Sequence, residues 1–126
     1  MAVSMSMPIL IVDDYNTMIR VLRNLLRQLG FSNIDEASDG HAALTKLRAK
    51  EYKLVISDWD MGGMSGAELL RHVRSSERYK STPVLMVASD AADGAATQKG
   101  GATSYLVKPF TAPTLKAKLI SVLGNF

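Results

Sequence analysis

Three aspartates and one lysine lie directly after predicted strands, and their residue types suit them to chemistry on a small anion. Asp13 and Asp14 follow the first predicted strand, Asp58 follows the third, and Lys108 follows the fifth. An aspartate in such a place also caps helices and starts turns, so each one alone is weak evidence. Three carboxylates at two central strand ends would nevertheless repel one another unless a cation lay among them. Mg²⁺ is the simplest explanation, because it prefers oxygen ligands and keeps several waters.

Lys108 supplies the positive side chain of this group. A lysine at a strand end is usually only solvated, but here its ammonium is expected at the same edge of the sheet as the aspartates. There it can offset the charge of a phosphoryl group. The bond between Lys108 and Pro109 is a candidate for a cis peptide, because only bonds that precede proline tolerate that form at low cost.

Short apolar runs predict the strands that position these residues. Three of them, 8–12, 53–57 and 83–88, are almost continuously apolar, as expected of parallel strands that are buried on both faces. Weaker candidates are 33–37 and 104–107. All five runs are short, which is the usual length of a strand in a globular domain.

Amphipathic segments between these runs predict helices, because their apolar residues recur with a period of 3.6. The apolar positions are Met18, Val21, Leu22, Leu25, Leu26 and Leu29, then Leu44 and Leu47, then Leu69, Leu70 and Val73, and finally Leu115, Leu119, Val122 and Leu123. Strands that alternate with helices through short loops require a parallel sheet covered by helices on both faces. Ligands of such sheets bind beyond the carboxyl ends of the strands, where the aspartates and the lysine are expected.

The composition is typical of one ordinary globular domain, with 126 residues, of which 47% are hydrophobic and 21% charged. Residues 1–7 lack a basic or long apolar segment and are interpreted as a flexible leader before a domain at 8–126. No apolar run approaches the length of a membrane span, so we expect no membrane insertion. The net charge of +3 is spread along the chain, which argues against nucleic acid as a partner. The absence of cysteine fits a cytoplasmic protein.

Four segments together resemble the receiver domain of two-component response regulators, from about Pro8 to the C-terminus. These segments are PILIVDD (8–14), LVISDWDMGGMSG (54–66), PVLMV (83–87) and YLVKPF (105–110). Within that family the chain is most similar to the stand-alone chemotaxis regulators of the CheY type. The local matches are Trp59 after the third strand, NLLRQLGF (24–31) and KPFT (108–111).

The resemblance implies a doubly wound α/β fold, with a five-stranded parallel sheet in the flavodoxin-like order 2-1-3-4-5. It also implies roles for single residues. Asp58 would accept the phosphoryl group, and Asp14, Asp58 and the backbone carbonyl of Asp60 would ligate Mg²⁺. Asp13 would act through metal-bound water, and Lys108 would contact the phosphoryl group.

The same resemblance implies the reaction and the partners. The phosphodonor would be a phosphohistidine on a sensor histidine kinase, and the Asp58 carboxylate would attack it in line. The chain would catalyse its own phosphorylation and slow dephosphorylation without being a conventional turnover enzyme. A cytoplasmic monomer would then bind a downstream protein, such as the flagellar motor switch, in its phosphorylated state.

Of the positions that the family uses for output, one departs from the usual pattern, and another allows two interpretations. Receivers usually carry Thr or Ser at the last position of the fourth strand, where this chain has Ala88. Ser89 comes one residue later and would face the opposite way in a strand, so it can replace that hydroxyl only if the strand ends early and the loop rearranges. Tyr105 occupies the aromatic position of the family's output face, although a half-buried tyrosine on a strand needs no function.

The segment 90–103 and the loop after Asp58 also depart from the pattern. The segment lacks large apolar residues and contains three glycines, each of which opposes a helix by about 1 kcal/mol if it lies in the interior. The sequence therefore predicts a fourth helix that is short, frayed or missing. Gly62 replaces a common proline and should loosen its loop, while Asp60 adds negative charge beside the acceptor.

Three other functions remain open. The first is a phosphate sink that drains a shared kinase without any output partner. The second is a phosphatase of the haloacid dehalogenase type, because Asp58 and Asp60 after an apolar strand resemble its Asp-x-Asp motif, in which the second aspartate is a general acid and base. The third is a receiver fold that is retained only as an inert scaffold.

Overall fold

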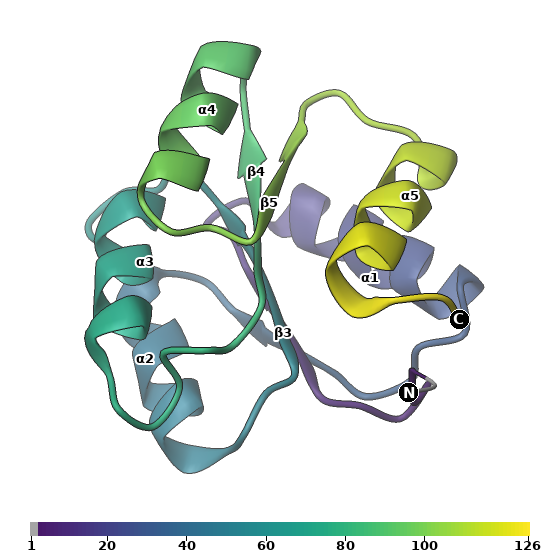
Figure 1. The fold of residues 1–126 in the computed structure, drawn as a ribbon, viewed down its shortest axis with the longest axis horizontal. Helices are drawn as coiled ribbons and strands as arrows, with labels where there is room; N and C mark the ends of the chain where they lie inside the picture. The colour runs from purple at the N-terminus through teal and green to yellow at the C-terminus, as the bar shows by residue number, and fades with distance from the viewer. Residues whose placement is uncertain (1–2) are drawn as a thin grey trace.

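The computed structural model describes residues 3–126, in which strands and helices alternate along the chain (Figure 1). In chain order the elements are β1 (Ile9–Val12), α1 (Asn16–Gln28), β2 (Ile34–Ala37), α2 (Gly40–Ala49), β3 (Leu54–Asp58), α3 (Gly66–Ser75), β4 (Val84–Ala88), α4 (Ala91–Lys99), β5 (Ser104–Val107) and α5 (Ala112–Leu123). The strands form one parallel sheet in the order β2-β1-β3-β4-β5. The predicted fold class and strand order are therefore confirmed.

The helices cover both faces of the sheet, with α1 and α5 on one face and α2, α3 and α4 on the other (Figure 1). Alternate residues of each strand enter two separate hydrophobic clusters. One cluster joins Ile9, Ile11, Ile56 and Val87 to apolar residues of α1 and α5. The other joins Leu10, Val12, Val55 and Met86 to apolar residues of α2 and α3. Burial on both faces explains why the central strands consist almost entirely of apolar residues.

The register of the central strands brings the candidate site residues to one edge. Val12 of β1 pairs with Ser57 of β3, so the residues that follow them, Asp13 and Asp58, leave adjacent strands side by side. Asp58 pairs in turn with Val87 of β4. The same edge continues through β5, whose last residue precedes Lys108. A parallel sheet thus collects side chains that are far apart in the sequence.

The prediction of a short, frayed or missing fourth helix is wrong, because α4 is a complete helix from Ala91 to Lys99. Asp90 caps its start by accepting a hydrogen bond of 2.8 Å from the Asp93 N–H. Of the three glycines, only Gly94 lies inside the helix, and the other two follow its end. The expected cost of about 1 kcal/mol per glycine applies only in a helix interior, so two of the three glycines do not weaken α4, and capping and tertiary packing support it.

Gly94 allows α4 to pack closely against β5. A Cβ atom at this position would overlap the ring of Tyr105 on β5, so the absence of a side chain makes room for the tyrosine. Thr97, one turn later, is completely buried and donates a hydrogen bond of 2.7 Å to the Gly94 carbonyl. The glycine that weakens α4 as an isolated helix therefore allows its tertiary contact with the sheet.

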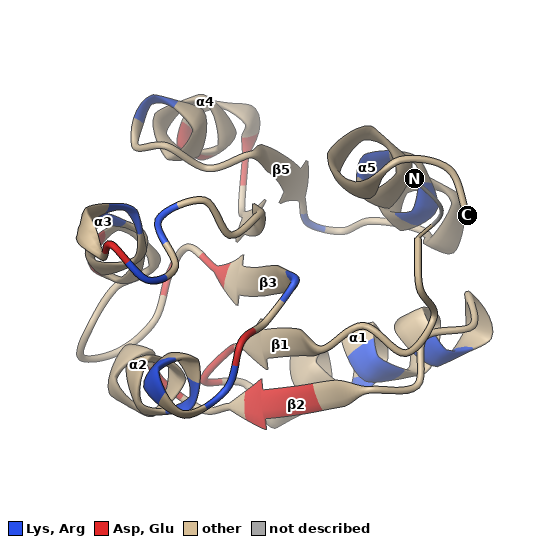
Figure 2. Cartoon of the chain, turned by 60° about the horizontal axis from the view of Figure 1, so that its bottom comes forward, with Lys and Arg blue, Asp and Glu red and all other residues tan. Residues whose placement is uncertain are grey.

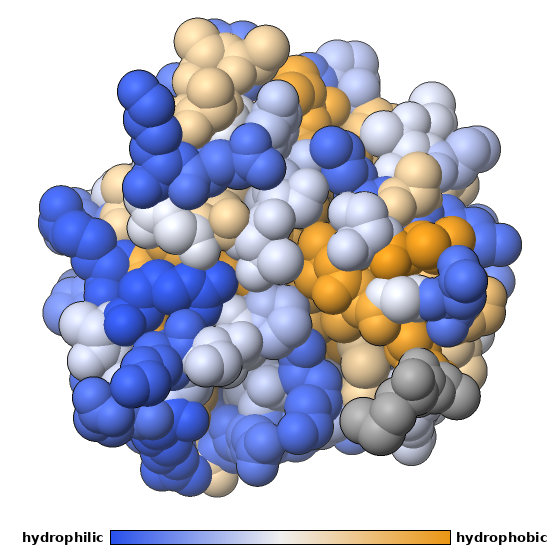
Figure 3. All heavy atoms as spheres, viewed as in Figure 1, coloured by the Kyte–Doolittle hydropathy of each residue, from blue (hydrophilic) through white to orange (hydrophobic). Residues whose placement is uncertain are grey.

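Both ends of the described chain pack beside α1 and α5. Met5 and Met7 contact the cluster on this face, and the Ser32 N–H donates a hydrogen bond of 3.1 Å to the Met5 carbonyl. Phe126 meets Phe31 edge to face, with ring centroids 5.1 Å apart. Figure 3 shows a hydrophobic area over the end of α5, next to this terminal packing. The flexible leader stays a prediction, although these contacts hold residues 3–7 against the domain.

Among residues 3–126, no helix combines the length and the apolar character that crossing a bilayer requires.

The close contact between Gly94 and Tyr105 predicts a coupling that chemical denaturation can measure. Helix propensity alone predicts that Gly94→Ala stabilises the protein by about 1 kcal/mol. Because the added Cβ overlaps the tyrosine ring, we expect no stabilisation, or a loss of about 1 kcal/mol, in the wild-type background. In a Tyr105→Ala background the same change should stabilise by about 1 kcal/mol. Equal effects in the two backgrounds would contradict the packing described here.

Candidate functional site

Three carboxylates meet at the carboxyl edge of the sheet, as their positions in the sequence suggested. Asp13, Asp14 and Asp58 each offer one oxygen, and these oxygens all lie within 4.8 Å of one another. Figure 2 shows acidic residues in red, including the end of β3, and basic residues in blue, including the segment just after β5. This arrangement brings three acidic groups and one lysine to the same edge.

Asp58 is the last residue of β3, the middle strand of the sheet, and it is only 5% exposed. Its Oδ1 atom lies 3.1 Å from Nζ of Lys108, which forms an ion pair with it. No hydrogen bond of good geometry reaches this buried oxygen from the described residues. Burial raises the pKa of the Asp58 carboxyl, and the opposing effect of the nearby Lys108 ammonium does not cancel it. Asp58 thus has unsatisfied capacity for a positive ligand.

Asp13 is also buried, with an exposed fraction of 2%. Its Oδ1 accepts a hydrogen bond of 2.9 Å from the Tyr15 N–H, which fixes the direction of the carboxylate. Burial raises the pKa of Asp13 from 3.8 to about 6; the Tyr15 N–H lowers it, and the charge of Asp58 raises it further. A carboxylate held charged in this place therefore costs the folded protein free energy when no cation is bound.

Asp14 is exposed and reaches across the edge to the loop after β3. Its Oδ2 accepts a hydrogen bond of 3.0 Å from the Gly62 N–H. That Gly62 loosens this loop stays a prediction, and the structure adds a specific contact between the glycine backbone and an acidic residue of the site. The loop is thus tied to the end of β1 at one point.

Gly66 is a residue of the site region whose role the sequence argument did not identify. It begins α3, and a Cβ atom here would overlap the Asp58 carbonyl and the Trp59 backbone. Its N–H donates a hydrogen bond of 3.0 Å to the Trp59 carbonyl, and Ser65 caps the helix. Only glycine lets α3 start so close to the backbone of Asp58 and Trp59. The Met-Ser-Gly sequence before an apolar helix was the available signal, since it combines an N-cap serine with a following glycine.

The end of β4 carries no hydroxyl, and the nearest one, that of Ser89, lies in the loop that follows. Ala88 is the buried last residue of β4, and Ser89 lies outside the strand and is exposed. The Ser89 hydroxyl lies 3.4 Å from Oδ2 of Asp60, with which it forms a hydrogen bond. Tyr105 is half-buried on β5, with Nζ of Lys118 5.1 Å from its ring centroid. Ser89 therefore contacts the residue two positions after Asp58.

A cavity of about 390 Å³ opens above the carboxylates. It is lined by Asp13, Asp14, Tyr15, Met18, Asp58, Asp60 and Lys108. The bond from Lys108 to Pro109 is cis. Tyr15 and Met18 were not recognised as site residues in the sequence, although a tyrosine directly after the acid pair was visible there.

The donor set fits Mg²⁺. Three carboxylate oxygens lie close enough to share one ion, and one of the residues, Asp58, has a buried oxygen that lacks a well-aligned donor. The donors are oxygen atoms only, which is the preference of a hard cation. Open space beside them leaves room for waters and for a phosphoryl oxygen.

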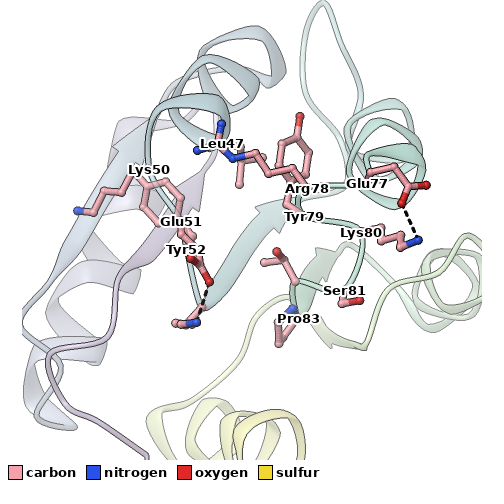
Figure 4. Close-up of a pocket in the computed structure, with 12 residues that line it drawn as sticks. Leu47, Lys50, Glu51, Tyr52, Glu77, Arg78, Tyr79, Lys80, Ser81 and Pro83 are labelled. Carbon is pink, nitrogen blue, oxygen red and sulfur yellow. Dashed lines mark hydrogen bonds and ion pairs between the residues drawn. The ribbon is translucent and has the colours of Figure 1, made fainter.

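A second hollow of about 340 Å³ lies at the start of β3 and β4, at the opposite edge of the sheet (Figure 4). Its carboxylates already have partners, because Glu51 pairs with Lys53 at 2.8 Å and Glu77 pairs with Lys80 at 3.1 Å. The acidic group described above therefore distinguishes the carboxyl edge as the candidate site.

The buried charge of Asp13 predicts a pH-dependent stability. The folded protein holds the Asp13 proton with a pKa of about 6, whereas the ordinary value is 3.8. Stability is therefore lost as the pH rises from about 3.8 to 6, and it stays lower above that range. With a chelator present, we expect Asp13→Asn to raise the free energy of unfolding by about 1–3 kcal/mol at pH 7.5. Urea titrations at pH 7.5 and pH 4 measure this, and the gain should shrink at pH 4.

The matched control for this experiment is Asp14→Asn, because Asp14 is an exposed member of the same group. Asp14→Asn should raise the free energy of unfolding by less than Asp13→Asn does, because an exposed carboxylate loses little hydration on folding. Equal gains for the two variants, or a gain for Asp13→Asn that does not depend on pH, would show that burial of Asp13 is not the cause.

Comparison with known proteins agrees with this geometry. Residues 9–120 match the response regulator receiver domain family. The chemotaxis protein CheY-3 of Vibrio cholerae is 47% identical over 116 residues, which cover 90% of this chain and 89% of that protein. The chemotaxis protein CheY of Pseudomonas aeruginosa is 49% identical over 115 residues, which cover 90% of this chain and 93% of that protein.

A solved structure gives the same result. The chemotaxis response regulator CheY4 of Vibrio cholerae superposes with a TM-score of 0.86 at 33% identity, covering 94% of this chain and 99% of that one. Fold, acidic group and sequence relationship therefore lead to one conclusion, which is that this chain belongs to the response regulator receiver family and is a CheY-like member of two-component signalling.

Proposed function

We propose that this chain is a single-domain, chemotaxis-type response regulator that accepts a phosphoryl group on Asp58 with Mg²⁺ and then binds a protein partner. The observation that carries the proposal is the position of Asp58, which is buried at 5% exposure between two further carboxylates and the Lys108 ammonium. The names of the CheY relatives support the chemotaxis setting. We propose a cytoplasmic monomer as its working form.

The chain's own residues suit an in-line transfer. A carboxylate oxygen of Asp58 is the nucleophile, and it opens into the cavity above the sheet. The Lys108 ammonium, 3.1 Å from Oδ1, is placed to hold the negative oxygens of the incoming group. Positioning and charge compensation are the main contributions that a protein makes to phosphoryl transfer.

Mg²⁺ would be held by Asp14, Asp58 and the backbone carbonyl of Asp60, with Asp13 acting through a bound water. When bound, the ion supplies neutralisation of the charge on the transferring group. The Tyr15 N–H fixes the orientation of the Asp13 carboxylate by a hydrogen bond, and the Gly62 N–H does the same for Asp14. Burial is the main cause of the raised pKa of Asp13 and Asp58, and the repulsion among the acidic groups adds to it.

Receiver domains take their phosphoryl group from histidine kinases, and we propose a sensor histidine kinase as the donor of this chain. The chain would catalyse its own phosphorylation and slow dephosphorylation, and it would not turn over a free substrate as an enzyme does. Ser89 is a second, weaker candidate for contact with the phosphoryl group. Its hydroxyl contacts Asp60, so a contact with the phosphoryl group requires the β4–α4 loop to rearrange.

Labelling with acetyl phosphate tests the acceptor. We expect wild-type protein to gain one phosphoryl group by intact mass with Mg²⁺ and none with excess chelator. Asp58→Asn should abolish labelling, because it removes the nucleophile. Lys108→Met should slow it by about 100-fold or more, since one preorganised charge is lost from the transferring group.

Lys99→Met serves as the matched control in this assay, because Lys99 is an exposed lysine at the end of α4. It should label at the wild-type rate. Wild-type protein that stays unlabelled in Mg²⁺ would favour the inert scaffold, and repeated hydrolysis of a phosphate ester would favour the dehalogenase-type phosphatase instead.

Partner binding separates a switch from a phosphate sink. We expect beryllofluoride, which mimics the phosphoryl group, to increase the affinity for a downstream protein by about fivefold or more, as a coupling of 1–3 kcal/mol gives. Pull-downs with wild type and Asp58→Asn, each with and without beryllofluoride and Mg²⁺, measure this. Equal and negligible capture in every condition would remove the switch and leave the sink.

A further inference from the structure

Tyr15 is a large aromatic side chain that stands exposed at the lip of the acceptor cavity. Its exposed fraction is 66%, and the other large hydrophobic residue that is clearly exposed in the described chain, Val21, reaches 41%. Tyr15 lines the same cavity as Asp58 and Lys108. The ring belongs to neither hydrophobic cluster, so it makes no contribution to the core that explains its presence.

The local structure gives no reason for a tyrosine at this position. Tyr15 is the N-cap residue of α1, and its side chain makes no capping hydrogen bond. Serine, threonine, aspartate or asparagine would stabilise this helix start better. The contacts that Tyr15 does make use its backbone, because its N–H donates to Asp13 and its carbonyl accepts from the Ile19 N–H at 3.2 Å. A residue that breaks a local rule beside a functional site often has a functional role.

The chemistry of the cavity indicates what this ring can contact. Five of the seven lining residues are acidic or basic, and only Tyr15 and Met18 offer uncharged surface. In an in-line transfer the leaving group lies on the side of phosphorus opposite the attacking Asp58 oxygen, and therefore toward the open side of the cavity. A flat aromatic leaving group can pack against an aromatic ring at the lip, whereas a small amine cannot.

We propose that the Tyr15 ring binds the imidazole of the phosphodonor during transfer and makes the site selective for N-phosphorylimidazole groups. This inference rests on the proposed function of Asp58. In the step, a new bond forms between the Asp58 oxygen and phosphorus while the bond from phosphorus to the imidazole nitrogen breaks. The bonding pair stays on that nitrogen, which takes a proton from solvent, and neutral imidazole leaves.

Two small donors that differ in their leaving group test the proposal. Phosphoimidazole releases imidazole, and phosphoramidate releases ammonia. Rate constants for Asp58 phosphorylation are measured with each donor by Trp59 fluorescence or intact mass. We expect Tyr15→Ala to lower the rate constant with phosphoimidazole by about three- to tenfold, as expected for one aromatic contact. The rate constant with phosphoramidate should stay within about twofold, and Tyr15→Phe should match wild type with both donors.

The controls separate this role from folding and from the acceptor chemistry. Val21→Ala removes exposed apolar surface from the same helix away from the cavity, and it should leave both rate constants unchanged. Beryllofluoride carries no leaving group, so its affinity should be equal in wild type and Tyr15→Ala. Equal losses with both donors, or no loss with phosphoimidazole, would overturn the role of Tyr15 while leaving Asp58 as the acceptor. Wild type that reacts with neither donor would instead overturn the proposed function itself.

Discussion

Repulsion among carboxylates at one edge of the sheet is the constraint on which the rest of the structure depends. The register of β1 and β3 brings Asp13 and Asp58 side by side, and both are buried. Water cannot stabilise these charges as it does at a surface, so the folded protein pays a free-energy cost that a bound cation would lower. The Lys108 ammonium compensates for part of this charge. The fold thus creates an acidic site, only partly neutralised by Lys108, whose donor set fits a divalent cation.

Backbone N–H groups hold the acidic side chains of the site close together. The Tyr15 N–H holds Asp13, and the Gly62 N–H holds Asp14, so the carboxylates cannot simply turn away from one another. Gly66 lets α3 begin directly against the backbone at Asp58, where any side chain would collide. These contacts involve main-chain atoms and the absence of side chains, and they come from loops that the rigid sheet positions. The acidic group around Asp58 is therefore held in place by the fold as well as by its own charges.

At β4 and β5 the sequence departs from the usual receiver pattern, although the fold is the same. Ala88 offers no hydroxyl at the end of β4, and Ser89 bonds to Asp60 instead. Tyr105 fits over Gly94 of α4, and the ammonium of Lys118 lies near its ring. Any signal that passes from Asp58 through this region must move the β4–α4 loop or the tyrosine without a strand hydroxyl. The close packing of Gly94 against Tyr105 therefore links α4 directly to β5.

The sequence by itself determined the sheet, the helices other than α4 and the acidic group, because apolar runs of strand length, helical periodicity and charged residues after strands are local patterns. It also placed Lys108 and Asp58 at one edge, since parallel strands share their carboxyl ends. Only the tertiary structure decided that α4 forms, because a glycine that weakens an isolated helix is offset by capping at Asp90 and by packing against Tyr105. It alone decided the raised pKa of Asp13 and the exposure of Tyr15, because burial depends on neighbours that are distant in the sequence.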